Sequence, residues 1–179
     1  MNKLFSILAI GFILIQTCTY AQVGNQFPDI EAVDLNDKAI KIPEDTKGKF
    51  TLIGMAFSEN AQKDLYTWSQ PVYSNFIDEN NLASLVYNPN VHLVLMFTGA
   101  KRAIFEKAKK KIIEGTDETL KDNVVLYKGI VGDYRKSLGI KDKKSPYFFV
   151  LDHEGKIIYA TSGRYSMKKL EEVGDLIEE

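Results

Sequence analysis

The residues with the most reactive side chains in this sequence are one cysteine, Cys18, and two histidines, His92 and His153. A single thiol cannot close an internal disulfide or build a metal site from several thiolates. The two histidines lie far apart in the sequence, and no Asp or Glu is spaced to orient either of them as a zinc ligand or a base. The sequence therefore predicts no metal site and no cofactor, and it favours a structural role for both histidines.

The first 21 residues have the pattern of a secretory signal peptide. Lys3 precedes an apolar run over residues 4–15, and Thr19-Tyr20-Ala21 offers small residues at the two positions that a signal peptidase reads. The run is shorter than the about 20 apolar residues that span a bilayer. We therefore expect cleavage before Gln22, export to the periplasm or the extracellular space, and a folded domain over residues 22–179.

Cys18 leaves one alternative open for the N-terminus. It follows Ile15-Gln16-Thr17, which loosely resembles a lipoprotein processing site, although Thr17 is larger than the residue usual before such a cysteine. Processing there would anchor the chain by a lipid on Cys18. With either cleavage the exported domain has no free thiol, so packing rather than disulfide bonding must stabilise it.

Charge and composition argue against two broad classes of protein. The 179 residues carry 23 basic and 24 acidic side chains, whereas a dedicated nucleic-acid-binding protein shows a strong basic excess. Ten Phe, nine Tyr and one Trp supply ample apolar surface for a core, which argues against disorder. We expect one globular domain that binds no nucleic acid.

Strands and helices are predicted to alternate along this domain. Residues 50–57 and 91–97 are nearly continuous apolar runs, as expected of strands buried on both faces. Between them, apolar residues recur at helical spacing over residues 61–76; Ser58 can cap this helix, and Pro71 should kink or break it. A strand–helix–strand unit of this kind favours parallel pairing.

The remaining elements complete an α/β pattern. In order, the sequence predicts small strands over residues 30–35 and 39–42, a helix over 100–114, a strand over 123–127, a short helix over 131–138, an antiparallel hairpin of residues 147–151 and 156–160, and a last helix from Ser166.

Two segments give this order of elements a family resemblance. Gly24-Asn25-Gln26-Phe27-Pro28-Asp29 resembles the opening of exported thioredoxin-like proteins of the TlpA and peroxiredoxin type, and residues 145–156 (SPYFFVLDHEGK) resemble their cis-proline strand and hairpin. The resemblance implies a thioredoxin-like α/β fold, with a central mixed β-sheet flanked by helices and small strands near the N-terminus. It also implies a cis peptide bond at Ser145–Pro146.

The catalytic motif of that family is absent. Redox members carry Cys-x-x-Cys at the start of the kinked helix, where a reactive thiolate attacks a disulfide and a second thiol resolves it. Counting from either end of the helix places the matching positions near Gln62 and Leu65 or near Lys63 and Tyr66. No cysteine follows position 18, so the sequence predicts no catalytic residue for thiol–disulfide exchange or peroxide reduction.

A binding groove is the remaining candidate site. Because redox relatives lay an extended substrate peptide beside the proline, the resemblance implies a peptide-binding groove formed by Ser58, Glu59, Asn60, Ser145, Pro146 and Tyr147. A thiol-free enzyme would have to use Ser58 or Glu59, but neither histidine is placed to complete a hydrolytic triad.

Two helices carry strongly biased charge. Before its end, the helix over residues 100–114 has a single acid, Glu106, against the basic residues Lys101, Arg102, Lys107, Lys109, Lys110 and Lys111. The last helix carries the acids Glu171, Glu172, Asp175, Glu178 and Glu179. Such faces are usually only solvated. The alternative is that the basic helix contacts an anionic membrane surface or an acidic partner.

The sequence supports one function and leaves an alternative open. A complete thioredoxin-like pattern without its chemistry predicts an exported, non-catalytic binding or assembly protein that holds a protein or an extended peptide. A mitochondrial family of ATP-synthase assembly factors is similar, through the Phe27-Pro28 opening and the Trp68-x-x-Pro71 helix. The alternative is a member of a thiol-disulfide oxidoreductase or peroxiredoxin-type family whose activity is lost or independent of thiols.

Overall fold

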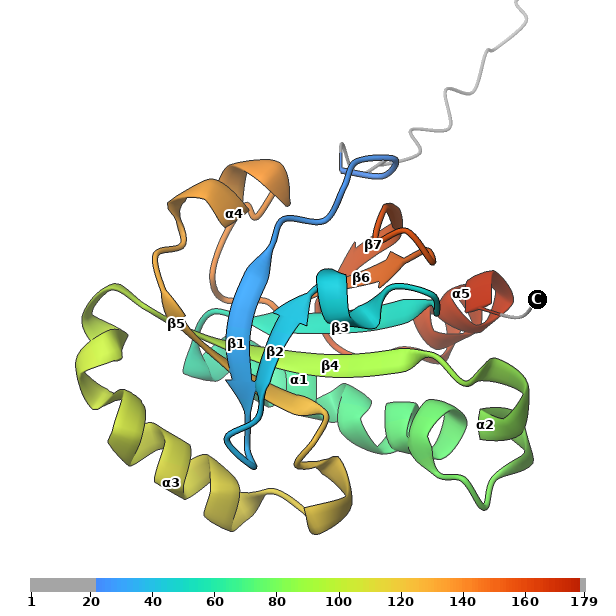
Figure 1. Ribbon diagram of the computed structural model, residues 1–179, viewed down its shortest axis with the longest axis horizontal. Coiled ribbons are helices and arrows are strands. Elements are labelled where there is room, and N and C mark those ends of the chain that lie inside the picture. Colours follow the sequence, from blue (N-terminus) through green and yellow to red (C-terminus); the bar gives the residue numbers. More distant parts are fainter. Residues whose placement is uncertain (1–21, 178–179) are drawn as a thin grey trace, which may run out of the picture.

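Seven strands form one mixed β-sheet in the computed structural model, which describes residues 22–177 (Figure 1). The predicted leader, with Cys18, and the acidic residues Glu178 and Glu179 lie outside the described residues. The strand order across the sheet is β2-β1-β5-β4-β3-β6-β7. The strands are β1 (Ile30–Asp34), β2 (Ala39–Ile42), β3 (Thr51–Ala56), β4 (Asn90–Thr98), β5 (Val124–Gly129), β6 (Tyr147–Leu151) and β7 (Ile157–Ser162).

The centre of the sheet is parallel, as predicted. β3 pairs in parallel with β4, and β4 with β5, whereas all the other neighbouring strands are antiparallel. Every residue of β3, and every residue of β4 after its first, is buried. Burial on both faces explains the continuous apolar runs in these two strands and confirms the expected α/β fold.

Helices pack on this sheet. The α-helices are α1 (Glu59–Val72), α2 (Leu82–Tyr87), α3 (Phe105–Gly115), α4 (Gly132–Ser137) and α5 (Met167–Ile177). Side chains of α1, α3 and α5 belong to the core on one face of the sheet, whereas α4 and the segment around Phe27 pack on the other face. The structure adds elements that the sequence pattern did not predict, namely α2 and the 3₁₀ turns Glu44–Thr46 and Glu118–Leu120, and the predicted basic helix begins with a 3₁₀ turn, Gly99–Ile104.

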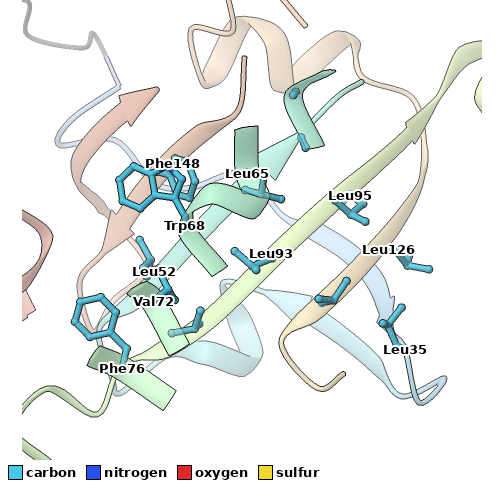
Figure 2. Packing of buried hydrophobic residues seen from close by; sticks show 14 of the residues in the cluster. Leu35, Leu52, Leu65, Trp68, Val72, Phe76, Leu93, Leu95, Leu126 and Phe148 are labelled. Carbon is cyan, nitrogen blue, oxygen red and sulfur yellow. The ribbon is translucent and has the colours of Figure 1, made fainter. Parts of the chain in front are cut away.

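Trp68 lies on the face of α1 that meets the sheet, and its side chain is buried in this core (Figure 2). Its ring stacks on Phe148 of β6 with 4.0 Å between centroids. Leu65 and Val72, one helical turn to either side, are fully buried in the same cluster. α1 packs closely on the sheet here because β3 carries Gly54, where a Cβ atom would lie 2.8 Å from Leu65 Cδ1. The helical spacing of apolar residues therefore sets which face of α1 meets the sheet.

Pro71 lies inside α1, close to its end. The helix passes directly into a π-helical turn, Tyr73–Ile77, and Asn75 Nδ2 donates a hydrogen bond to the carbonyl oxygen of Pro71 at 2.7 Å. Proline lacks the N–H that would continue the α-helical ladder. The expected disturbance thus takes the form of a change in helix type, with a side chain occupying one of the backbone acceptors.

The predicted cis peptide bond at Ser145–Pro146 is wrong: among the described residues the cis bond is Ile42–Pro43. The prediction depended on the family resemblance alone, whereas an unconstrained X–Pro bond favours trans by about 0.5–1 kcal/mol. A local turn leads into this strand, since Asp142 Oδ1 accepts hydrogen bonds from the N–H groups of Lys144 and Ser145 at 2.7 and 3.2 Å. With the chain delivered by that turn, the bond keeps its default trans geometry.

Candidate functional site

The candidate site lies at the carboxyl end of β3, where α1 begins. Ser58 is the N-cap of α1: its Oγ accepts a hydrogen bond from the N–H of Ala61 at 3.1 Å, which confirms the predicted cap. Glu59 occupies the first turn, at the positive end of the helix dipole. The kinked helix therefore begins at Glu59, as predicted from the cap. The two sets of positions near 62–66 that counting matched to the Cys-x-x-Cys motif lie about one turn further along it. Neither set of positions contains a cysteine.

The two segments of the predicted groove meet at this end of the sheet, where the ring of Phe57 contacts that of Tyr147 edge-on with 6.4 Å between centroids. The proline segment offers little free surface, because Pro146 and Tyr147 are buried. The Pro146 carbonyl accepts the N–H of Gly163 at 2.9 Å, and Tyr147 Oη accepts the N–H groups of residues 141 and 142 at 3.0 and 3.1 Å. Ser58 and Ser145 are half-buried, whereas Glu59 and Asn60 are exposed, so the most accessible part of the predicted site is its α1 segment.

A groove opens on the β4 side of this helix start, between α1 and the basic helix α3, and we call it the α1–α3 groove. Its volume of about 430 Å³ lies within the range of about 300–1,000 Å³ that is typical of ligand-binding sites. On one wall it is lined by Ser58, Glu59, Gln62 and Tyr66. On the other wall it is lined by Lys101, Ile104, Ala108, Lys111 and Ile112. Two of the predicted site residues, Ser58 and Glu59, thus face this groove, whereas Asn60 and residues 145–147 are not among its lining residues.

The floor of the α1–α3 groove is apolar. Leu95 and Phe97, at the carboxyl end of β4, are buried beneath it, and Ala56 closes it on the β3 side. At its rim, Tyr66 is 46% exposed and Ile104 is 52% exposed. An apolar hollow with exposed large side chains at its edge is typical of a surface that binds another molecule.

The charge of the groove is positive. Two lysines, Lys101 and Lys111, line it against one acid, Glu59. Lys101 Nζ reaches the segment between β3 and α1, where it donates a hydrogen bond to the carbonyl oxygen of Phe57 at 3.3 Å. The groove therefore combines apolar contact area with cations that favour a ligand bearing a carboxylate or another anion.

Apart from Ser58, Glu59 and the basic residues Lys101 and Lys111, the residues that line the groove were not predicted from the sequence. A signal for them exists, because Glu59, Gln62 and Tyr66 recur at steps of three and four, which places them on one face of a helix. Ile104, Ala108 and residues 111–112 recur in the same way. The sequence could show each helix face, but only the strand order brings the two faces together.

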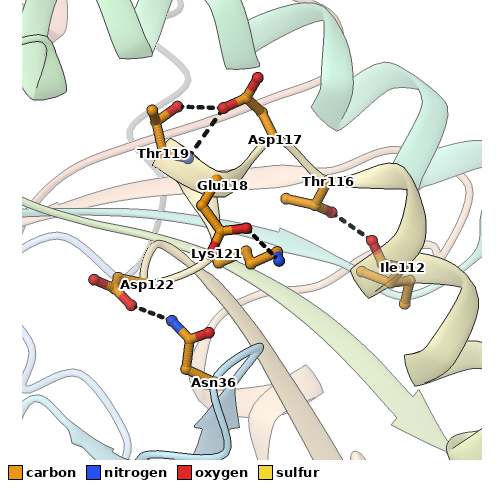
Figure 3. A network of polar contacts seen from close by, with 8 residues as sticks. All are labelled: Asn36, Ile112, Thr116, Asp117, Glu118, Thr119, Lys121 and Asp122. Carbon is orange, nitrogen blue, oxygen red and sulfur yellow. Dashed lines mark hydrogen bonds and ion pairs between the residues drawn. The ribbon is translucent and has the colours of Figure 1, made fainter.

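A second hollow, of about 690 Å³, lies at the amino end of the parallel strands and is lined mainly by polar residues. Its rim is fixed by polar contacts between loops, among them the hydrogen bond from Asn36 Nδ2 to Asp122 Oδ1 at 2.6 Å (Figure 3). His92 lines this hollow but is only 9% exposed, and its Nδ1 is buried without a hydrogen-bond partner. Burial lowers the pKa of His92 to about 4, against a smaller opposing effect of Asp34.

The described residues do not bring Ser58 together with a histidine. In the β3–β4 register His92 lies opposite Ile53, five residues before Ser58, or about 16 Å at ~3.3 Å per residue. His153 lies in the turn between β6 and β7, where its ring packs against Phe50 with 4.4 Å between centroids. Over residues 22–177, no group of three or more His, Cys, Asp or Glu side chains is arranged to hold a metal ion.

None of the helices in the described part of the chain is both long and apolar enough to cross a membrane.

Comparison with known proteins gives one family and many similar folds. A family model described as ATP10 protein matches residues 20–177. No curated protein sequence matches the chain. Among solved structures, the pneumococcal exposed lipoprotein thioredoxin (Etrx1) from Streptococcus pneumoniae is similar with a TM-score of 0.57 and 16% sequence identity, over 83% of this chain and 99% of that chain.

Two further solved structures show the same likeness. A thiol:disulfide interchange protein from Bacteroides sp. has a TM-score of 0.57 and 20% identity, over 88% of this chain and 91% of that chain. BsSco, a member of the Sco family of cytochrome c oxidase assembly proteins, has a TM-score of 0.56 and 10% identity, over 84% of this chain and 91% of that chain. At these identities the likeness shows the fold alone, and it confirms the expected thioredoxin-like fold.

Proposed function

Because this chain belongs to the ATP10 protein family, whose model matches residues 20–177, we propose that it is a non-catalytic binding protein in the assembly of a larger protein complex. One observation carries this proposal. The α1–α3 groove lies at the helix start where redox members of the thioredoxin-like superfamily present their thiols, yet no cysteine follows residue 18. The location suits the binding of a polypeptide, and the atoms for redox chemistry are missing from it.

The missing thiols matter because both chemistries of the superfamily begin with a thiolate. Thiol–disulfide exchange needs one thiolate to attack and a second thiol to resolve the mixed disulfide. Peroxide reduction likewise oxidises a thiolate first. The hydroxyl that stands at the helix start, Ser58 Oγ, accepts the N–H of Ala61 and so caps the helix. A capping hydroxyl of this kind stabilises α1 and offers no substitute for a thiolate.

Two likenesses support a role in assembly. The Phe27-Pro28 opening and the Trp68-x-x-Pro71 helix resemble those of ATP-synthase assembly factors. BsSco, which has the same fold, belongs to a family of cytochrome c oxidase assembly proteins. Since one fold serves many functions, these likenesses indicate a class of role rather than a partner. We infer that the partner is a polypeptide subunit of a membrane-associated complex of the ATP-synthase kind.

We also propose that residues 1–21 direct export and that the domain acts in the periplasm or outside the cell. The single positive charge at Lys3, the apolar run over residues 4–15 and the small residues before Gln22 support this location. The mass of the N-terminal peptide of the natural protein distinguishes cleavage before Gln22 from a lipid-modified Cys18.

The processed protein is expected to leave insulin disulfides unreduced and hydrogen peroxide unconsumed, at the rate of a protein-free blank. The physical reason is that residues 22–179 contain no thiol. An active thioredoxin and an active peroxiredoxin in the same buffers serve as positive controls. A rate clearly above the blank would contradict the non-redox assignment and favour the alternative of a thiol-independent enzyme.

A photo-crosslinking amino acid placed at the groove is expected to capture a partner polypeptide in the native cell. Benzoylphenylalanine replaces Gln62, which lines the α1–α3 groove, and in the matched variant it replaces Lys136, which is exposed on α4. We expect one dominant adduct from the Gln62 variant that the Lys136 variant does not form. The same adducts from both variants, or none from either, would contradict the assignment of this groove as the binding site.

A further inference from the structure

The two walls of the α1–α3 groove differ in charge. On the α3 wall Lys111 is exposed and lines the groove, and Lys107, one turn earlier on the same helix, is exposed as well. On the α1 wall, Glu59 lies in the first turn of the helix, and Gln62 and Tyr66 follow it without charge. The lining cations, Lys101 and Lys111, thus stand on one lip of the groove, while the lining residues of the other lip are neutral beyond its first turn.

The basic residues of α3 do not all serve this lip. Lys109 pairs with Asp37 in the turn between β1 and β2, on another side of the helix. Lys110 is exposed and follows Lys109 in sequence, and it does not line the groove. Because successive residues of an α-helix point about 100° apart, Lys110 and Lys111 have the same charge and nearly the same backbone position but different directions.

We infer that the α1–α3 groove binds a segment of the partner polypeptide in which large apolar side chains are followed directly by Asp or Glu. The inference depends on the proposed binding function and specifies the ligand chemistry of the same site. The apolar side chains occupy the floor over Leu95 and Phe97, and the carboxylates lie against Lys111, which lines the groove, with Lys107 exposed one turn earlier on the same helix. Charge complementarity of this kind fixes the direction of the segment in the groove.

The dimensions of the groove suit a short extended segment. The wall from Lys101 to Lys111 runs through the 3₁₀ turn and α3 and rises about 16 Å, at about 2.0 Å per 3₁₀ residue and about 1.5 Å per α-helical residue. An extended peptide covers that length with four or five residues at ~3.3 Å each. A cavity of about 430 Å³ holds a few side chains rather than a whole additional helix. Only side chains of the bound segment therefore enter the groove, and the backbone of the segment lies along the opening of the groove.

An anionic membrane is the competing ligand for the basic helix. A bilayer surface attracts exposed lysines by long-range charge, so its affinity depends on how many lysines there are rather than on which way each one points. A bilayer is also broad, whereas the apolar floor of the groove lies between two helices. The recessed floor and the directional lip favour a polypeptide segment, and the two neighbouring lysines provide a test.

The test compares Lys111→Glu with Lys110→Glu, two variants with the same charge change at adjacent exposed positions. The probe is a fluorescent decapeptide with a Leu-Phe-Glu-Glu centre, and the control probe has a Leu-Phe-Gln-Gln centre. Fluorescence anisotropy is expected to show that the acidic peptide binds the unchanged protein at least about tenfold more tightly than the neutral peptide. Lys111→Glu should weaken the acidic peptide about tenfold, and Lys110→Glu less than about twofold.

Three outcomes overturn the inference. They are the absence of binding by the acidic peptide, equal binding of the two peptides, and equal losses in the two variants. Vesicles of phosphatidylcholine and phosphatidylglycerol are assayed in parallel, and retention on them that falls equally in both variants assigns the basic helix to a membrane surface. If Lys111→Glu leaves the Gln62 crosslink intact, the binding function stands and the acidic ligand class is wrong. If the variant with benzoylphenylalanine at Gln62 and no other change forms no adduct, the binding function itself is refuted.

Discussion

Replacing Trp68 with alanine is expected to lower the free energy of unfolding by about 3–5 kcal/mol, as usual for removal of a large aromatic side chain from a core. Trp68 is 0% exposed, and its ring stacks on Phe148 at 4.0 Å and meets Tyr165 edge-on at 5.7 Å between centroids. Its Nε1 also donates a hydrogen bond to the carbonyl oxygen of Gly163 at 3.1 Å. The truncation would therefore leave both a cavity and an unpaired carbonyl between α1 and the C-terminal hairpin.

The loss is measured by urea denaturation followed by circular dichroism, because Trp68 is the only tryptophan and its fluorescence disappears in the variant. Tyr66→Ala is the matched control, since Tyr66 lies two residues earlier on α1 and is 46% exposed; its cost should stay below about 1 kcal/mol. Trp68→Phe keeps an aromatic ring and loses the hydrogen bond, so it should fall between the two. Equal losses for Trp68→Ala and Tyr66→Ala would contradict the central place of Trp68 in the core.

The sheet and the helix that carries Trp68 could be predicted because their signals are local. Strands β3 and β4 are buried on both faces, and this burial leaves uninterrupted apolar runs in the sequence. Helix α2 could not be predicted in the same way, because it has only six residues and two of its apolar side chains point to solvent. Leu82 is 81% exposed and Val86 is 58% exposed, so the apolar pair at helical spacing marks a face that is exposed rather than buried.

The candidate site was less predictable than the fold because it depends on contacts between distant segments. Ser58 could be recognised as a cap from its own helix, but the α1–α3 groove exists only because β4 lies beside β3 and both crossover helices pack on the same face. The geometry at Ser145–Pro146 was predicted wrongly for a related reason. A motif shows which residues are present. It does not show the conformation of the backbone before the proline, on which the isomer of the X–Pro bond depends.

The stability of the protein is expected to fall by about 2 kcal/mol between pH 7 and pH 5 through His92 alone. His92 is 9% exposed, and burial lowers its pKa to about 4, from an ordinary value near 6.5. In the unfolded chain the imidazole binds a proton as the pH falls through 6.5, whereas in the folded chain it stays neutral until the pH approaches 4. Between these values the unfolded state binds more protons, so the free energy of unfolding rises with pH.

The buried Nδ1 of His92 gives this pH dependence its structural cause. The atom has no hydrogen-bond partner, so protonation of the ring would bury a positive charge in the sheet. The carboxylate of Asp34 would offset only part of the desolvation cost of that charge. His92→Phe removes the titrating group and should flatten the slope of unfolding free energy between pH 5 and 6.5. His153→Gln, which replaces the exposed histidine of the turn, is the matched control for the loss of a histidine. Urea titrations at each pH measure both slopes, and a slope that survives His92→Phe would show that another group controls acid stability.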